Sequence, residues 1–487
     1  MIKILVIGCG PHATHFYLPA LMNMIGTDGD ISFAGVLDIL PQKEFVREEL
    51  RMRDLPVKSW FVPPFSGDSL SGEARRLLDD LVDSGQVNAV IISTDPLNHV
   101  SYAEWAIRRR LPILLDKPVS TRENAVLDID QAKKIEDDYE SLLQAYREIP
   151  EEMRPPFILC AHRRYHPGIL FVRELIAEVS AKTSCPVTSI RSMHSDGQWR
   201  LPHEILTQDH HSYHQGYGKV SHSGFHFIDC VCEFWKSGLV GSGKSADEIR
   251  VFSSFVRPAG LLHQLDRGDY CRLFPEYENA CPESDEELRQ RYQQCGEIDA
   301  EVSMSMCADG EPFSLASMGL LHNSYSQRSW LQPDRDLYKG NGRIKHEEHI
   351  VNIGPFLNIQ VHSYQSKDKH QVCTMDDDRP GGNNHFEISI FRNSRMIGGK
   401  PFEHFNLKEL DGAREFSTDS LFITQVKRKC IDEWLAAIRV KRFEEEKMLS
   451  AFSDHRMSVR LMSAIYQSYC LQRTVGNPIV SVPWSLK

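Results

Sequence analysis

The chain starts with a short apolar run that leads directly into a glycine-rich turn. Lys3–Ile7 ends in four aliphatic residues, and the sequence Gly8-Cys9-Gly10 follows directly. A glycine turn between a buried strand and a helix lets backbone amides approach a pyrophosphate, which the helix N-terminus also attracts. This feature predicts a parallel α/β sheet whose first strand carries a dinucleotide-binding turn.

The rest of the turn agrees with the Gly/Ala form of the dinucleotide fingerprint. Ala13 stands at the third glycine position, after Pro11 and His12, and a helical pattern follows over His15–Met24. Tight turns also need glycines for purely structural reasons, so the turn alone does not establish a cofactor. The strand before it and the helix after it are the context that favours dinucleotide binding.

Asp38 ends the second predicted strand, Ser32–Leu37. An acid at this place bonds the ribose hydroxyls, although Asp38 lies somewhat beyond the usual distance of about 20 residues from the turn. Ile39 and Leu40 follow it, and Lys43 is the nearest base. Because nothing obvious neutralises a ribose 2′-phosphate, the sequence favours NAD over NADP as cofactor.

Short β-branched runs alternate with amphipathic stretches through the first part of the chain. Further strands are predicted over Val87–Ser93 and Pro112–Leu115, with a helix over Val100–Arg109 between them. This alternation is typical of strands joined by crossover helices. We expect an N-terminal Rossmann domain, a doubly wound parallel sheet, over residues 1–155.

Lys117 follows the last of these strands, in the sequence Asp116-Lys117-Pro118. A lysine in a turn is ordinarily a solvated surface residue. Beside a bound nicotinamide it would instead donate to a substrate oxygen and favour its alkoxide form, which strengthens the hydride donor. The position therefore makes Lys117 a candidate catalytic residue.

A second, α+β domain is expected over residues 156–487. Strands of an antiparallel sheet are predicted from alternating apolar and polar runs over Val187–Met193, Asn358–Tyr364 and Phe386–Phe391. The polar, acidic stretch Asp266–Glu301 is predicted to be an insertion, and Asp376–Asn384 a loop. Helices are predicted over Phe422–Arg439 and Asp454–Tyr469.

The segment Gly218–Asp229 holds the densest group of reactive side chains. His222, His226 and Asp229 have the spacing of one helix face, which could present a base and the acid that orients it. An imidazole titrates near neutral pH and can take a hydroxyl proton while hydride leaves the same carbon. A helix start with satisfied, partly buried histidines accounts for the same spacing.

Several histidines precede this segment and raise the question of a metal. His210 and His214 have the i, i+4 spacing of helical ligands. No H-E-x-x-H motif and no Cys or Asp set completes a site, so we predict no metal. Polar substrate contacts or a solvated loop explain the histidines more simply.

The composition limits which binding partners and which cellular compartment are expected. The charge balance is 56 basic against 67 acidic residues, or −11, without a long basic stripe, which argues against a nucleic-acid partner. The 12 cysteines form no C-x-x-C pair, and several lie in apolar runs typical of reduced thiols. No stretch has the pattern of a signal peptide or a membrane span, so a cytoplasmic protein that binds a small molecule is expected.

Four ordered motifs in the first 240 residues resemble those of the Gfo/Idh/MocA oxidoreductases, the family of glucose-fructose oxidoreductase and inositol dehydrogenase. They are Thr94–His99 for T-P-x-x-x-H, Asp116-Lys117-Pro118 for E-K-P, His162–Pro167 for N-R-R-F-x-P, and His222–Asp229 with Trp235 to Gly238 for D-x-G-x-H-x-x-D before W-x-x-G. The resemblance implies a Rossmann domain followed by a domain whose open, mostly antiparallel sheet covers the cofactor and often forms homo-oligomers.

The resemblance also implies roles for individual residues. Lys117 would polarise the substrate oxygen and His226 would act as acid and base, with His222 beside them. Cofactor contacts would come from Gly8, Gly10, Pro11, His12, Ala13, Asp38, Thr94, Asp95, His99, Asp116 and Lys117. Substrate contacts would come from His162, Arg163, Arg164, Tyr165 and Asp229, with the polar segment His322–Trp330 as a further candidate.

One departure from the family pattern concerns His222, which stands where the family has its catalytic aspartate. An aspartate would hold Lys117 charged and orient the hydroxyl, and an imidazole cannot do so in the same way. The leading hypothesis is an NAD-dependent oxidoreductase acting on a secondary alcohol or ketone of a sugar or cyclitol. The alternatives are an enzyme that cleaves glycosides by transient oxidation and elimination, and a dinucleotide-sensing regulator without activity.

Overall fold

The computed structural model describes residues 1–25, 29–54, 57–65, 69–208, 211–332, 342–366, 378–413, 422–440, 443–474 and 476–484. The chain forms two compact units. The first consists of Met1–Thr121, Asp137–His162 and Val426–Arg456, and the second of Arg122–Glu136, Arg163–Gln425 and Met457–Lys487.

The first unit is built on a six-stranded parallel sheet. Its order is β3-β2-β1-β4-β5-β6, with β1 at Ile2–Ile7, β2 at Ile31–Ile39, β3 at Lys58–Val62, β4 at Ala89–Ile92, β5 at Ile113–Leu115 and β6 at Phe157–Leu159. This is the strand order of a doubly wound Rossmann sheet, with its switch point between β1 and β4. The predicted N-terminal fold class is confirmed.

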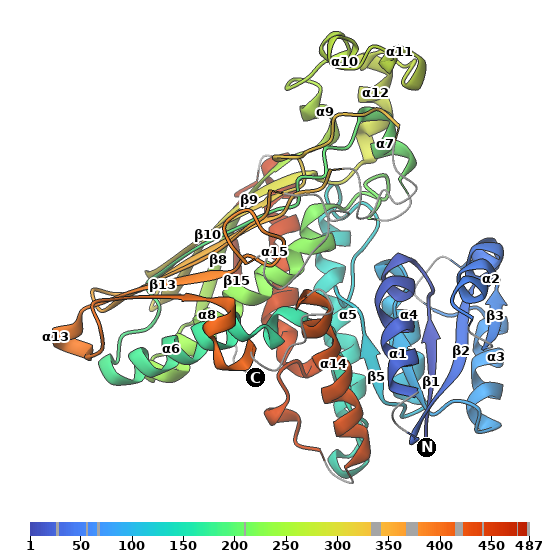
Figure 1. Ribbon diagram of the computed structural model, residues 1–487, viewed down its shortest axis with the longest axis horizontal. Coiled ribbons are helices and arrows are strands. Elements are labelled where there is room, and N and C mark those ends of the chain that lie inside the picture. The colour runs from blue at the N-terminus through green and yellow to red at the C-terminus, as the bar shows by residue number, and fades with distance from the viewer. Residues whose placement is uncertain are drawn as a thin grey trace. The chain divides into compact units, whose positions relative to one another are not determined.

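Helices cover both faces of this sheet (Figure 1), and β1, β4, β5 and β6 are accordingly apolar and buried on both sides. They are α1 at Leu18–Ile25 after the π-helical turn η1 (Ala13–Tyr17), α2 at Lys43–Met52, α3 at Gly72–Asp83, α4 at His99–Arg108 and α5 at Ile129–Arg147. Part of α14 (Phe422–Arg439) also belongs to this unit. Tyr139 in α5 donates a hydrogen bond to the carbonyl of Phe452, 2.9 Å away, which ties the C-terminal segment to the unit.

The second unit is built on a nine-stranded sheet of order β14-β13-β12-β11-β7-β10-β9-β8-β15. The strands are β7 at Ser189–Ser195, β8 at Glu248–Val256, β9 at Asp299–Ala308, β10 at Glu311–Leu321, β11 at His346–Ile353, β12 at Leu357–Tyr364, β13 at Glu387–Arg392, β14 at Phe402–Asn406 and β15 at Val480–Pro483. Only the pairing of β7 with β10 is parallel among these strand pairs. Because β14 and β15 form its two edges, the sheet is open. It is also mostly antiparallel, as predicted.

Helices of the described residues pack on one face of this sheet. Helices α6 (Pro167–Thr183) and α8 (Phe225–Ser242) cross the sheet (Figure 1) and contact each other, and α8 contacts β7. On the opposite face the strand registers align four exposed apolar side chains, namely Phe252, Leu315, Phe391 and Phe402. The strands alternate accordingly between buried and more exposed residues.

Short helices gather at one end of the second sheet (Figure 1). They are α9 at Pro258–Leu261, α10 at Arg267–Leu273, α11 at Tyr277–Ala280 and α12 at Asp285–Arg291, and they share a core with α7 (Pro202–Thr207). The predicted insertion, Asp266–Glu301, covers helices α10 to α12 and the first three residues of β9, which begins at Asp299 and pairs with β8 and β10. Of the predicted loop Asp376–Asn384, Asp376 and Asp377 lie outside the described residues.

Candidate functional site

The dinucleotide turn, Gly8–Ala13, joins β1 to the first helix of the sheet. Gly8 has φ +89°, and a Cβ on it would lie 2.5 Å from the carbonyl oxygen of Ser93, so the turn requires glycine there. Gly10 differs, since no heavy atom of the described residues would lie within 4 Å of its Cβ. The fold therefore does not need glycine at Gly10, and the open space suits the close approach of a pyrophosphate.

Asp38 lies at the carboxyl end of β2 and faces the dinucleotide turn. Its Oδ2 accepts a hydrogen bond from the backbone N–H of Cys9 at 2.7 Å, and its Oδ1 accepts one from Ile39 N at 2.7 Å. Burial raises the pKa of Asp38, and these two hydrogen bonds oppose that shift. The carboxylate is thus held next to the dinucleotide turn.

His12 connects the dinucleotide turn to the Asp116-Lys117-Pro118 turn. Its Nδ1 lies 2.7 Å from Oδ2 of Asp116. Burial lowers the pKa of His12 to about 4, against the attraction of Asp116. At neutral pH the imidazole is therefore neutral, and its Nδ1–H donates to the carboxylate. Burial would raise the pKa of Asp116, but His12 and Lys117 outweigh it and lower that pKa below its usual range.

His99 fixes the same turn from its other side. Its Nδ1 lies 2.8 Å from the carbonyl oxygen of Pro118, and its Nε2 lies 3.1 Å from that of Thr94. Asp95 caps the next turn by accepting a hydrogen bond from Leu97 N at 3.0 Å. The buried His99 is thus placed to hold the backbone around Lys117, which is itself half-buried.

Lys427 is a residue near the turn that the sequence did not reveal. It comes from α14, and its Nζ lies 3.3 Å from Nε2 of His12 and 5.4 Å from the ring centre of Phe16. No motif precedes or follows it, and it is more than 400 residues from His12 in the chain. It adds a cation to the edge of the dinucleotide turn.

These residues fit a dinucleotide. Gly10 leaves room at the helix start, Asp38 would supply a carboxylate for a ribose, and Lys117 follows the end of β5. The His12 to Asp116 contact joins the two turns within one unit. The first unit therefore brings together the predicted cofactor residues and the predicted catalytic lysine.

In the second unit, His222 lies in a π-helical turn, η6 (Val220–Gly224), directly before α8. Its buried ring stacks on His211 at 4.6 Å and 11°, and faces His322 at 5.9 Å and 22°. Tyr213 and Tyr217 meet it edge-on at 5.7 and 5.5 Å. His222 thus lies in the π-turn, and His226 lies in the first turn of α8.

The expected acid partner of these histidines is bound elsewhere. Asp229 accepts two hydrogen bonds from Arg164, from Nε at 2.8 Å and from Nη2 at 2.7 Å, and a third from Ser458 Oγ at 2.7 Å. Arg164 and Asp229 are 2% and 1% exposed, so this is a sealed ion pair. His226 lies one turn earlier in α8 and is also buried.

The predicted substrate residues of the 162–167 segment are largely enclosed by protein. Arg163 pairs with Glu347 and lies 4.3 Å above the ring of Phe227. His162 and Tyr165 are 8% and 5% exposed. Both residues lie in η5 (His162–Tyr165), and Pro167 begins α6 after it.

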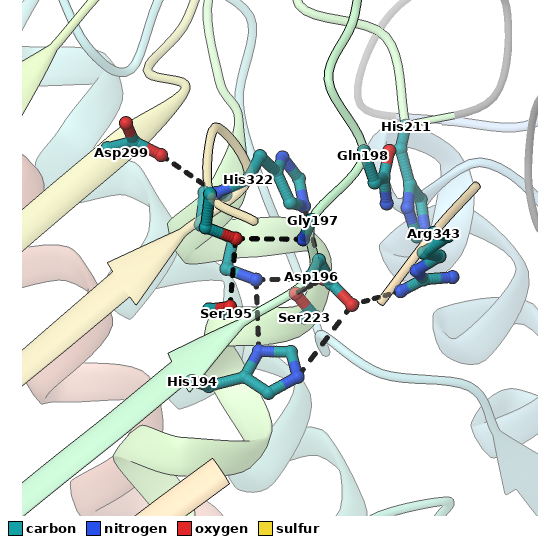
Figure 2. A network of polar contacts seen from close by, with 12 residues as sticks. His194, Ser195, Asp196, Gly197, Gln198, His211, Ser223, Asp299, His322 and Arg343 are labelled. Carbon is teal, nitrogen blue, oxygen red and sulfur yellow. Dashed lines mark hydrogen bonds and ion pairs between the residues drawn. The ribbon is translucent and has the colours of Figure 1, made fainter. Parts of the chain in front are cut away.

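A polar network that the sequence did not predict surrounds Asp196, directly after β7 (Figure 2). We call it the Asp196 cluster; its members are His194, Asp196, Lys219, Ser223, His322 and Arg343. Asp196 accepts hydrogen bonds from Lys219 Nζ at 2.8 Å and Ser223 Oγ at 2.9 Å, and it pairs with Arg343. His322 Nε2 lies 3.4 Å from the same carboxylate.

The register of the sheet explains how this cluster forms. β7 and β10 are parallel, with Ser195 opposite Leu321, so Asp196 and His322 both follow the same end of the sheet. The His322 ring is fixed further by Tyr213, whose hydroxyl lies 2.5 Å from Nδ1. A sequence shows which residues end a strand but not which strand ends meet.

Burial shapes the charges of the cluster. Lys219 and Asp196 are both 0% exposed. Burial lowers the pKa of Lys219 to about 8, although Asp196 opposes the shift. Burial and the nearby Lys219 lower the pKa of His322 to about 3, so its ring stays neutral. Burial would raise the pKa of Asp196, but Arg343 and Lys219 hold it well below its usual value.

Glu297 forms hydrogen bonds at the start of η6. Its Oε1 accepts hydrogen bonds from Val220 N at 2.8 Å and from the hydroxyl of Tyr466 at 2.9 Å. Burial raises the pKa of Glu297 to about 7. Its backbone carbonyl leaves no room for a side chain at Gly218, where a Cβ would lie 1.9 Å away.

Two further observations concern metals and membranes. Within the described ranges, no three His, Cys, Asp or Glu side chains are grouped as metal ligands, and His210 of the predicted His210/His214 pair lies outside those ranges. Among the helices described, none is long and apolar enough to cross a membrane.

Comparison with known proteins finds a family model that matches the N-terminal part of the chain. Residues 2–146 match the model of the GFO_IDH_MocA oxidoreductases, a family with an NAD-binding Rossmann fold. Among curated proteins, no sequence matches the chain. The resemblance drawn from the sequence motifs is confirmed.

Solved structures extend the similarity in fold to the whole chain. A levoglucosan dehydrogenase in complex with NADH and levoglucosan aligns at 13% identity and a TM-score of 0.59, covering 99% of this chain and 100% of the other. An aldose-aldose oxidoreductase from Caulobacter crescentus, complexed with glycerol, aligns at 13% identity and a TM-score of 0.54, covering 99% of both chains. An oxidoreductase from Agrobacterium radiobacter, in complex with NAD+, L-tartaric acid and magnesium, aligns at 12% identity and a TM-score of 0.55, covering 99% and 98%. At these identities the likeness concerns the fold.

Proposed function

Since residues 2–146 belong to the NAD-binding Gfo/Idh/MocA oxidoreductases, we propose that the protein is an NAD-dependent dehydrogenase of a sugar, cyclitol or sugar derivative. It would move a hydride between the nicotinamide and a secondary alcohol or ketone. The observation that carries this proposal is the 2.7 Å contact of His12 with Asp116, which joins the dinucleotide turn to the turn that holds Lys117. The dehydrogenases and aldose oxidoreductase of similar fold support the substrate class.

The roles of the reacting groups follow from their chemistry. When bound, the nicotinamide supplies the hydride acceptor. Lys117 donates a hydrogen bond to the substrate oxygen, His226 takes the hydroxyl proton, and His222 binds a neighbouring hydroxyl. Asp38 repels a 2′-phosphate and bonds the ribose hydroxyls, which favours NAD over NADP.

Other predicted residues receive supporting roles. We propose that His12, Asp116 and His99 position Lys117, because their contacts reach both sides of its turn. We assign Arg164 and Asp229 to holding α8 in place rather than to the substrate, since each satisfies the other in a sealed pair. The substrate contacts that remain from the prediction are His162, Arg163 and Tyr165.

The proposal extends to the compartment and the assembly. All 11 described cysteines are free, which suits a reducing cytoplasm. We also propose a homo-oligomer that uses the exposed sheet face with Phe252, Leu315, Phe391 and Phe402. A small-molecule substrate, and neither nucleic acid nor a membrane, is the expected partner.

The test is reduction of NAD and NADP by the purified protein with a panel of inositols, sugars, amino sugars and uronates. Lys117→Ala and His226→Ala should each lower kcat/KM by about 10²–10⁴-fold for the accepted substrate class. Lys133→Ala and His263→Ala change exposed residues of the same types and should leave the rate unchanged. Cofactor that copurifies without net reduction would point instead to internal redox cleavage of a glycoside, and turnover that survives both active-site substitutions would contradict the assignment.

A further inference from the structure

One oxygen of Asp196 holds residues on both sides of His222. Asp196 Oδ2 accepts a hydrogen bond from Lys219 Nζ at 2.8 Å and another from Ser223 Oγ at 2.9 Å. Lys219 directly precedes η6 and Ser223 is its fourth residue, so His222 lies between them in the chain. The other oxygen, Oδ1, accepts a hydrogen bond from Arg343. Asp196 is thus fixed by its partners, and it connects the start of η6 to its end.

The same oxygen lies beside the ring that faces His222. Nε2 of His322 is 3.4 Å from Asp196 Oδ2, and its Nδ1 is 2.5 Å from the Tyr213 hydroxyl. Because burial and Lys219 lower the pKa of His322 to about 3, its ring is neutral and carries one proton. A proton on Nε2 points to the carboxylate and leaves Nδ1 to accept from Tyr213. His222 therefore faces, at 5.9 Å between ring centres, a ring that Asp196 and Tyr213 hold in place.

Residues at the ends of three strands contact η6. Asp196 follows β7, Glu297 lies two residues before β9, and Leu320 is the last residue but one of β10. A Cβ on Gly224 would lie 2.8 Å from Leu320 Cδ1, so the turn packs closely on β10. π-helical turns are rare, occur mostly as single turns within helices, and are frequent at functional sites. His222 is the central residue of this turn, which makes it the group that these contacts orient.

We propose that Asp196 is a positioning residue, which orients the His222 ring for its contact with a hydroxyl of the bound sugar or cyclitol. This inference rests on the proposed function, in which His222 binds that hydroxyl. Asp196 is 0% exposed, so it acts through Lys219, Ser223 and His322 rather than on the substrate. Hydrogen bonds weaken steeply away from their preferred angle, so a small rotation of the His222 ring would weaken substrate binding.

Ser223→Ala is the first test, because it removes one contact of Asp196. The ion pairs of Asp196 with Lys219 and Arg343 remain in this variant. In the full-length protein with NAD and the accepted substrate, we expect KM for the substrate to rise about tenfold, the value of one hydrogen bond, with kcat within about twofold. Ser223→Thr keeps a hydroxyl and should restore most of the affinity. Ser242→Ala removes another half-buried serine hydroxyl of the same unit and should change neither constant.

Tyr213→Phe tests the second route, which runs through His322. The substitution keeps the ring, which belongs to a hydrophobic core, and removes only the hydroxyl. We expect KM to rise several-fold with little change in kcat. Tyr292→Phe removes a buried hydroxyl that donates to the carbonyl of Pro202, 2.7 Å away, and should leave KM unchanged. Equal effects of the two phenylalanine variants would overturn the part assigned to His322.

A double-mutant cycle distinguishes positioning from a merely structural role. His222→Ala removes the group that Asp196 is proposed to orient. In that background Ser223→Ala should cause no further rise in KM, because its effect passes through His222. Fold-changes that multiply would show that Ser223 supports the protein independently of His222, and they would overturn the inference.

Hydrogen exchange separates this inference from the proposed function, because it needs no substrate. Mass spectrometry of a peptide that spans residues 218–225 should show exchange about tenfold faster in Ser223→Ala than in the wild type or in Ser242→Ala. NAD reduction with an unchanged KM in Ser223→Ala would overturn the inference and leave the dehydrogenase intact. Without NAD reduction by any substrate, faster exchange would count against the dehydrogenase and support the hold of Asp196 on η6. Unchanged exchange would overturn that hold as well.

Discussion

The dinucleotide turn of the first unit and the Asp196 cluster of the second are held together by different forces. The turn depends on backbone geometry, with Gly8 in a positive-φ conformation and Asp38 accepting backbone hydrogen bonds. The cluster depends on buried charges that come from separate segments of the chain. The turn should therefore be sensitive to added atoms, and the cluster to removed charge.

The largest effect is expected from Asp196→Asn. The substitution leaves Lys219 and Arg343 without their shared carboxylate, and removing one partner from a buried ion pair costs about 3–5 kcal/mol. Urea denaturation should show this loss in the free energy of unfolding. Asp130→Asn removes a carboxylate that is 79% exposed, and it should cost less than about 0.5 kcal/mol. Equal effects of the two substitutions would contradict the claim that charge holds the cluster.

Glu297→Gln should change how stability depends on pH. The folded chain keeps the Glu297 proton up to about pH 7, whereas the unfolded chain loses it near 4.5. Because the folded state then binds more protons, this carboxyl lowers the free energy of unfolding as pH rises from about 4.5 to 7, by at most about 3 kcal/mol. The glutamine variant should lack this decline. Denaturation midpoints at pH 5 and pH 7.5 provide the measurement.

Asp299 is the internal check on this prediction. Burial also raises its pKa, to about 6, so it contributes a decline of the same sign over a lower pH range. That contribution should remain in Glu297→Gln and disappear in Asp299→Asn. A glutamine variant whose pH profile matches the wild type would show that Glu297 is ionised in the folded protein.

Two glycine-to-alanine substitutions test the dinucleotide turn by adding an atom instead of removing a charge. Gly8→Ala places a Cβ 2.5 Å from the Ser93 carbonyl at positive φ, and it should cost about 2 kcal/mol of stability. Gly10→Ala meets no described atom within 4 Å, and it should keep stability or raise it by about 0.4–1 kcal/mol. It should nevertheless weaken NAD binding about tenfold, because the methyl fills the space for the pyrophosphate.

Thermal denaturation and NAD titration, monitored by protein fluorescence, separate the two effects. Tight NAD binding by Gly10→Ala would place the pyrophosphate elsewhere. Unchanged stability of Gly8→Ala would show that the turn can adopt another backbone conformation. Either result would remove the distinction between a glycine needed by the fold and one needed by the ligand.

The same contrast explains what the sequence could predict. The dinucleotide turn, Asp38 and Lys117 each follow a strand with a clear apolar run, so local pattern locates them. Strand β3 and helix α3 were not predicted; β3 has only five residues and an exposed lysine at its start. The predicted insertion overlaps the start of β9 because charged residues continue into the first residues of that strand.

The Asp196 cluster depends on information that no local pattern contains. Asp196, His322 and Arg343 meet because β7 pairs in parallel with β10 and antiparallel with β11, in registers that follow from the whole sheet. His322 was a candidate from its polar segment, but Asp196 and Arg343 carried no motif. The π-turn η6 was not predicted for a related reason, since Glu297, which contacts its start at Val220 and Gly218, is distant in sequence.

The smallest expected effect concerns Lys427, which places a positive charge beside the dinucleotide turn although it is distant in sequence. Its Nζ lies 3.3 Å from His12 and is half-buried, so it should attract the pyrophosphate but remain partly screened by solvent. Lys427→Met should weaken NAD binding about two- to fivefold and reduce the dependence of that binding on salt. Lys429→Met changes a lysine two residues away in the same helix and should have no such effect. An equal loss for both variants, or a loss independent of salt, would mean that Lys427 supports the packing of α14 rather than the cofactor. The affinity of the dinucleotide turn for NAD would then come from its backbone geometry alone.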